Sequence, residues 1–231
     1  MGACMPTMGK PQAPPAASSV VLLGRPGAGC TSLLQALAVA AESSGKGSGG
    51  GADGCGFVDG GHGGAAPRTG KGHGGKASAA IDGSGVTIRR LTVGGLLLDM
   101  MDVGALDQMH AVFRKNGLSA TAVIYTLDAS SPATFAAAAT DLRRLFIGDR
   151  AAKTTIFPDV PLVLAINRIP SGAPRQATGE YVRRLRVDDL PVRALHAVAI
   201  ESVSGQHPGV HRTLAVLAAE VRRARESSLV T

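Results

Sequence analysis

A glycine-rich turn between a short apolar run and a helical pattern constrains the fold of this chain more than any other feature. The apolar run covers residues 19–23 and ends at Gly24, which is typical of a buried strand. The turn reads G-R-P-G-A-G-C-T over residues 24–31. Leu33, Leu34, Leu37 and Ala41 then recur at helical spacing. A strand, a glycine turn and a helix in direct succession predict the first unit of an α/β domain.

The turn matches the phosphate-loop pattern G-x-x-x-x-G-K-[ST] at every fixed position but one, because Cys30 stands where the pattern has lysine. In such a loop, successive backbone N–H groups and the N-terminus of a helix face the phosphates. The hydroxyl of Thr31 would then bind Mg²⁺. The turn by itself also fits a tight strand-to-helix connection that binds nothing.

The rest of the chain alternates between strand and helix patterns. We predict further strands at 86–93, 96–101, 120–127, 160–166 and 194–200, with a hairpin turn at 94–95, and helices at 105–115, 132–145, 178–185 and 210–226. Ser130 or Ser131 is expected to cap the second of these helices. This order predicts an α/β fold with a mostly parallel six-stranded sheet and helices on both faces. Ligands bind at the carboxyl ends of such strands, where Gly24, Asp102, Asp128 and Asn167 lie.

One segment departs from ordinary globular composition. Of the 31 glycines, 17 lie between residues 45 and 85. Such a segment buries too little apolar surface to offset the chain entropy, so we predict a disordered insertion at about 43–85. The expected organisation is a flexible segment at 1–18, one domain at 19–226 that contains the insertion, and a tail at 227–231.

Four further motifs follow the phosphate loop in a recognisable order. They are the run L-L-L-D-M-M-D-V-G ending at Gly104, the strand A-V-I-Y-T-L-D-A-S, the sequence Asn167-Arg168-Ile169-Pro170, and Ser202-Val203-Ser204. In order and spacing, residues 19–42 and 86–226 resemble the ADP-ribosylation factor and Arf-like small GTPases. That resemblance implies a P-loop small-GTPase fold.

The resemblance also implies a ligand and a role. It implies GTP or GDP with Mg²⁺, the metal being held by Thr31 and Asp102. The implied nucleotide-binding residues are Gly24, Arg25, Gly27, Ala28, Gly29, Cys30, Thr31, Ser32, Gly104, Asn167, Arg168 and Ser204. The expected function is a regulatory switch or adaptor in vesicle trafficking, with protein effectors or a larger complex bound through residues 86–117.

Several functional positions differ from the family pattern. Cys30 replaces the lysine, and as a thiol or as a thiolate favoured by the helix N-terminus it is a poorer phosphate ligand. Arg25 is a candidate for partial compensation. Leu106 replaces the glutamine that orients water, and Pro170 replaces the aspartate that binds guanine. No clear switch threonine exists, since the count back from Asp102 ends near Gly83 or Ser84.

These departures leave other readings open. We assign no catalytic residue and expect weak or absent hydrolysis. The alternative is a pseudo-GTPase, a protein-binding module that holds no nucleotide. A P-loop ATPase or kinase is a third reading, although no catalytic carboxylate or second phosphate clamp stands out in the sequence.

Charge and composition bear on partners and location. The net charge is +7, but only five Phe, two Tyr and no Trp are present, so stacking on single-stranded nucleic acid is not expected. Three cysteines without metal or disulfide spacing suggest a reducing, cytoplasmic setting. Gly2 is a candidate for N-terminal acylation and hence peripheral membrane contact, although Pro6 stands where the usual pattern has Ser or Thr.

Overall fold

The computed structural model describes residues 17–45, 80–81, 86–103, 120–148, 155–168, 177–201 and 206–228. Its strands are β1 (Ser18–Gly24), β2 (Ala80–Ile81), β3 (Thr87–Val93), β4 (Leu96–Asp102), β5 (Ala122–Asp128), β6 (Leu162–Asn167) and β7 (Leu195–Ile200). Its α-helices are α1 (Cys30–Gly45), α3 (Phe135–Phe146), α4 (Ala177–Leu185) and α5 (Pro208–Ser228), and short 3₁₀ turns occupy Pro132–Thr134 and Val187–Asp189.

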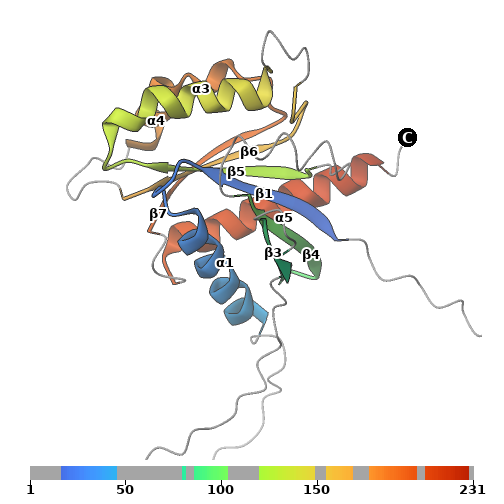
Figure 1. The fold of residues 1–231 in the computed structure, drawn as a ribbon. Helices are drawn as coiled ribbons and strands as arrows, with labels where there is room; N and C mark the ends of the chain where they lie inside the picture. The colour runs from blue at the N-terminus through green and yellow to red at the C-terminus, as the bar shows by residue number, and fades with distance from the viewer. Residues whose placement is uncertain are drawn as a thin grey trace, which may run out of the picture.

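The strands form one sheet in the order β2-β3-β4-β1-β5-β6-β7. Strands β4, β1, β5, β6 and β7 are parallel, whereas β3 runs antiparallel to β4. Figure 1 shows α3 and α4 on one face of this sheet and α1 and α5 on the other. The predicted six-stranded, mostly parallel architecture is therefore confirmed, and the two-residue β2 extends it along β3.

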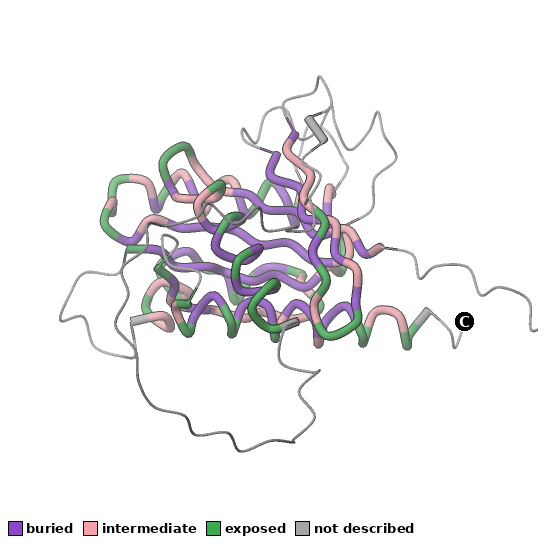
Figure 2. The backbone as a smooth tube through the Cα atoms, turned by 90° about the horizontal axis from the view of Figure 1, so that it is seen from below, coloured by how far each residue is buried: buried purple, intermediate pink, exposed green. Residues whose placement is uncertain are grey.

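Alternation along the strands divides the core into two layers. Val20 and Leu22 of β1 belong to the cluster that packs against α1 and α5, whereas Val21 and Leu23 belong to the cluster beneath α3. All four are at most 1% exposed. A central strand that is apolar on both faces is what a parallel sheet covered by helices requires. Figure 2 shows the buried residues along the strands and the inner sides of the helices.

Two predicted boundaries need correction. Helix α1 continues to Gly45, three residues into the segment predicted as an insertion. In its last turn the hydroxyls of Ser43 and Ser44 both donate to the Ala40 carbonyl, at 2.9 and 2.8 Å. Strand β2 also lies within that segment. The rest of the insertion, the helix predicted at 105–115 and the ends at 1–16 and 229–231 lie outside the described residues.

The predicted serine cap on the helix after β5 is also wrong in detail. Ser131 occupies the N-cap position of the 3₁₀ turn, but its side chain makes no capping hydrogen bond. The side chain of Ser130 instead donates to Asp128 at 2.6 Å. The turn is closed by Thr134, whose hydroxyl donates to the Ser131 carbonyl at 2.7 Å. Ser130, one of the two predicted capping residues, therefore binds the Asp128 carboxylate at the end of β5 and does not cap the helix.

The registers bring the functional strand ends to one edge of the sheet. Leu22 of β1 pairs with Asp102, Gly24 with Thr126, and Asp128 with Asn167. The expectation that Gly24, Asp102, Asp128 and Asn167 share one edge is confirmed. Among the described residues, no helix is long and apolar enough to cross a membrane.

Candidate functional site

The predicted phosphate loop connects β1 to α1 and is shaped by its glycines. Gly27 and Gly29 have φ angles of +82° and +96°, in the left-handed region that favours glycine. Gly24 is required by space, since a Cβ there would lie 2.6 Å from Cys30 Sγ and 2.8 Å from the Thr126 carbonyl oxygen. The loop backbone therefore approaches β5 more closely than a side chain allows.

Backbone amides give this loop its capacity for anions. The Ala28 N–H donates to the Arg25 carbonyl at 3.0 Å, which closes the turn, and the Leu33 N–H donates to the Gly29 carbonyl at 2.8 Å, which starts the helix. The first N–H groups of an α-helix have no partner within the helix and carry partial positive charge. This geometry suits the phosphates of a nucleotide.

The two predicted metal ligands lie together. The Thr31 hydroxyl, in the first turn of α1, donates to Asp102 Oδ2 at the end of β4 at 2.9 Å. Asp102 is 7% exposed, whereas Thr31 faces solvent. Hydroxyl and carboxylate oxygens suit Mg²⁺, which commonly keeps waters and phosphate oxygens as its other ligands. No group of three or more His, Cys, Asp or Glu side chains is positioned for a metal within the described ranges.

Cys30 brings no charge to this site. Burial raises the pKa of its thiol to about 11, and the interaction with Thr126 only partly offsets that rise. Of the two states considered for Cys30, this pKa favours the neutral thiol, because desolvation outweighs the effect of the helix end. Its sulfur lies against Gly24, at the end of β1. The Thr126 hydroxyl is also buried there, and it has no hydrogen-bond partner of ordinary geometry among the described residues.

Arg25 does not replace the missing lysine in this structure. Its guanidinium contacts Asp141 of α3, with Nη1 2.9 Å from Oδ2. The Tyr125 hydroxyl donates to the same carboxylate oxygen at 3.2 Å, and burial raises the pKa of that tyrosine. Arg25 therefore ties the phosphate loop to α3.

Asn167 joins the loop after β6 to the phosphate loop. Its side chain is 1% exposed, and Nδ2 donates to the Ala28 carbonyl at 3.0 Å. Its Oδ1 accepts from the Arg168 N–H at 3.0 Å, which supports the left-handed φ of +54° at Arg168. Asn167 thus ties the end of β6 to the phosphate loop.

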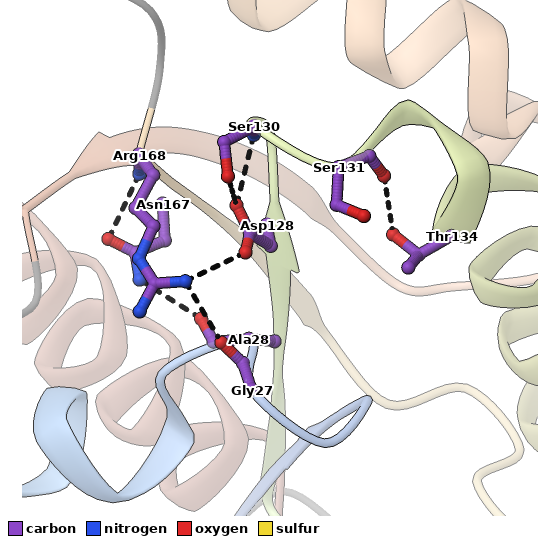
Figure 3. Close-up of polar contacts among 8 residues, drawn as sticks. All are labelled: Gly27, Ala28, Asp128, Ser130, Ser131, Thr134, Asn167 and Arg168. Atoms are coloured by element: carbon purple, nitrogen blue, oxygen red, sulfur yellow. Dashed lines mark hydrogen bonds and ion pairs between the residues drawn. The ribbon is translucent and has the colours of Figure 1, made fainter.

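Arg168 lies between three loops, as Figure 3 shows. Its Nη1 contacts Asp128 Oδ2 at 2.9 Å and donates to the Gly27 carbonyl at 3.3 Å. Burial alone would raise the pKa of Asp128, but hydrogen bonds from Ser130 and the contact with Arg168 hold it below its ordinary value. The sequence placed Asp128 at a strand end but did not identify this partner. The available signal was its opposite charge to Arg168, at the end of the next strand in the sheet.

A cleft of about 160 Å³ lies beside the outer side of the phosphate loop. It runs between the end of β5 and the start of α3, and its lining includes Arg25, Thr126, Asp128, Thr134, Ala138 and Arg168. Pockets that enclose small molecules usually measure roughly 300–1,000 Å³. The cleft is smaller than such pockets, and the candidate site therefore rests on the loop backbone and on the contact between Thr31 and Asp102.

The structure brings together most predicted site residues, namely Gly24, Arg25, Gly27, Ala28, Gly29, Cys30, Thr31, Ser32, Asp102, Asn167 and Arg168. Gly2, Gly104 and Ser204 lie outside the described residues, as do Ser84, Leu106 and Pro170.

Comparison with known proteins identifies the fold. No protein-family model matches the sequence, and no curated protein matches it. Among solved structures, the chain is similar to the Arl6 (BBS3) small GTPase from Trypanosoma brucei with a bound nucleotide analogue, GppNp. The TM-score is 0.54 at 16% identity, and the match covers 90% of this chain and 99% of that one. This chain has the P-loop fold of the small GTPases.

Proposed function

We propose that this small-GTPase-like protein binds a guanine nucleotide with Mg²⁺ and acts as a regulatory switch or adaptor, with weak or absent GTP hydrolysis. The observation that carries the proposal is the 2.9 Å contact between Thr31 and Asp102 beside the phosphate loop. A loop kept only as a turn would need its glycines, but it would not need a hydroxyl and a buried carboxylate that meet at its metal-binding side.

The chain's own residues suggest how a nucleotide would be held. The amides of residues 27–32 would receive the phosphates, and Thr31 and Asp102 would hold Mg²⁺ directly or through water. Bound Mg²⁺ supplies charge neutralisation of the phosphate oxygens. Asn167 fixes the loop that faces the base, and the aliphatic stem of Arg168 offers a surface against which the base can pack.

Weak hydrolysis follows from the sequence. Leu106 stands where the family pattern has the glutamine that orients the attacking water, and a leucine side chain forms no hydrogen bond. Pro170 likewise offers no side-chain acceptor to guanine. We therefore expect slow turnover and a reduced preference between guanine and adenine.

One observation favours a second candidate, a pseudo-GTPase that holds no nucleotide. The position of the missing lysine is filled by a half-buried cysteine, which has no positively charged form, and Arg25 is engaged with Asp141. In that case the loop serves only to build a protein-binding surface. We propose protein effectors at 86–117 for either candidate, and we propose a cytoplasmic protein that acylation at Gly2 would bring to a membrane.

Nucleotide content and titration distinguish the two candidates. The purified protein is denatured, and the supernatant is analysed by HPLC; GDP and GTP are then titrated calorimetrically with Mg²⁺ or with EDTA. We expect binding that Mg²⁺ strengthens, and we expect Thr31→Ala to lose that strengthening. The matched control is Thr140→Ala, since the exposed Thr140 hydroxyl donates only to its own helix, to Ala136 at 3.0 Å. An empty protein that takes up no nucleotide at millimolar concentration contradicts the proposal.

A further inference from the structure

We propose that this site prefers a nucleoside diphosphate with Mg²⁺ to the corresponding triphosphate. The inference rests on the proposed function, because it concerns which phosphate chain the same loop accepts. It is carried by the way the structure distributes positive charge around the loop.

The first step is the missing cation. In the phosphate-loop pattern, lysine reaches the β- and γ-phosphates. Cys30 occupies that position, and a thiol group carries no positive charge in either protonation state. Its sulfur also lies against Gly24 at the end of β1, where a Cβ on that glycine would be only 2.6 Å away from it. The residue at this position therefore offers no positive charge to a terminal phosphate.

The second step is that both arginines in contact with the loop are already engaged. Arg25 is paired with Asp141 on α3, and Arg168 is paired with Asp128 at the end of β5, each with a nitrogen–oxygen distance of 2.9 Å. Arg168 additionally donates to the Gly27 carbonyl. To reach a terminal phosphate, either arginine would have to leave its carboxylate partner. The carboxylate would keep its donor from Tyr125 or Ser130 but would lose its positive partner near a highly charged ligand.

The third step is what remains for the ligand. Loop amides and the N-terminus of α1 serve the phosphates nearest the loop, and Thr31 and Asp102 serve Mg²⁺. These groups are sufficient for a diphosphate. A triphosphate brings additional negative charge into a site where the Asp102 carboxylate is already negative. Among the loop residues described above, no further cation balances that charge. A missing charge-assisted contact corresponds to roughly a ten- to hundredfold difference in affinity.

The test compares diphosphate with triphosphate on the intact chain. GDP and GTP, and in parallel ADP and ATP, are titrated calorimetrically with Mg²⁺. We expect the diphosphate of each pair to bind roughly ten- to a hundredfold more tightly. A triphosphate that binds as tightly as its diphosphate, or more tightly, overturns the inference and leaves the proposed function standing. Absence of binding by all four nucleotides overturns the proposed function, and the inference with it.

A charge-restoring variant tests the cause of the preference. Cys30→Lys should raise triphosphate affinity more than diphosphate affinity and so reduce or reverse the ratio. The matched control is Val39→Lys, which adds the same charge to α1 at a side chain that is 55% exposed, more than two turns from the loop. The control should leave the ratio unchanged. An equal change in both variants overturns the inference, because the preference would then depend on net charge alone.

Discussion

Removal of the Asn167 side chain tests whether the tie between the two loops stabilises the fold. Asn167 is 1% exposed, and its Nδ2 donates to the carbonyl of Ala28, a residue that is itself 3% exposed. Asn167→Ala leaves that carbonyl without this donor in a place that water reaches poorly. A buried polar group that loses its partner costs on the order of 1–3 kcal/mol. We expect the free energy of unfolding to fall by about that amount.

The assay is urea unfolding followed by circular dichroism, in which the midpoint should fall while the slope is unchanged. Thr126→Val is the matched control. Thr126 is 1% exposed, like Asn167, and lies near the same strand ends, but its hydroxyl makes no hydrogen bond of ordinary geometry with the described residues. Valine keeps the shape and removes an oxygen whose contact with the Cys30 thiol is weak, so stability should stay the same or rise. The reasoning is refuted if Asn167→Ala is neutral, or if Thr126→Val destabilises the protein as much as Asn167→Ala does.

Three further predictions concern the same edge of the sheet. Gly24→Ala should lower the free energy of unfolding in urea by about 1–3 kcal/mol. The new Cβ would lie 2.8 Å from the Thr126 carbonyl oxygen, which is a backbone atom and cannot rotate away. Unchanged stability would contradict this close approach. Asp128→Asn should make the free energy of unfolding fall less steeply as the pH is lowered into the acid range. The folded-state pKa of Asp128 lies below its ordinary value of 3.8, so its contribution is present above that value and is lost as the pH falls through the lowered one. An acid profile that matches the parent protein would refute this. Arg25→Ala removes the ion pair with Asp141, in which the arginine side chain is 40% exposed. The free energy of unfolding, measured by heat or urea, should fall by only about 0.2–1 kcal/mol, because solvent screens such a pair. A much larger fall would contradict this reasoning.

The sheet and its order of elements follow from the sequence because their signals are local. Apolar runs of strand length alternate with helical spacing, and the Gly94-Gly95 turn, with φ angles of +54° and +80°, closes the predicted hairpin between β3 and β4. Strand ends were less predictable. Strands β4, β5 and β6 each continue to a polar residue, Asp102, Asp128 or Asn167, because ladder pairing to the neighbouring strand holds the backbone extended past the last apolar side chain.

The sequence predicted which residues form the candidate site, but not which of their side chains contact one another. Spacing placed the loop glycines and Thr31, and the family resemblance supplied Asp102 as the partner of Thr31. The partners of Arg25 and Arg168 depend on side chains that meet across loops far apart in the chain. The state of Cys30 depends on burial, which opposes the effect of the helix end and exceeds it.

A well-formed phosphate loop is by itself weak evidence for a bound ligand, because several residues at this loop also stabilise the fold. Gly24 is required by the approach to Thr126, and Asn167 satisfies a buried carbonyl. Selection for stability alone would retain both. Thr31 is different, since it is exposed and its hydroxyl contacts only a carboxylate that is itself nearly buried. Loss of this hydroxyl removes a donor from Asp102, but it does not alter the backbone of the loop. The dependence of nucleotide affinity on Thr31, and not the presence of the glycines, therefore decides whether the site still binds.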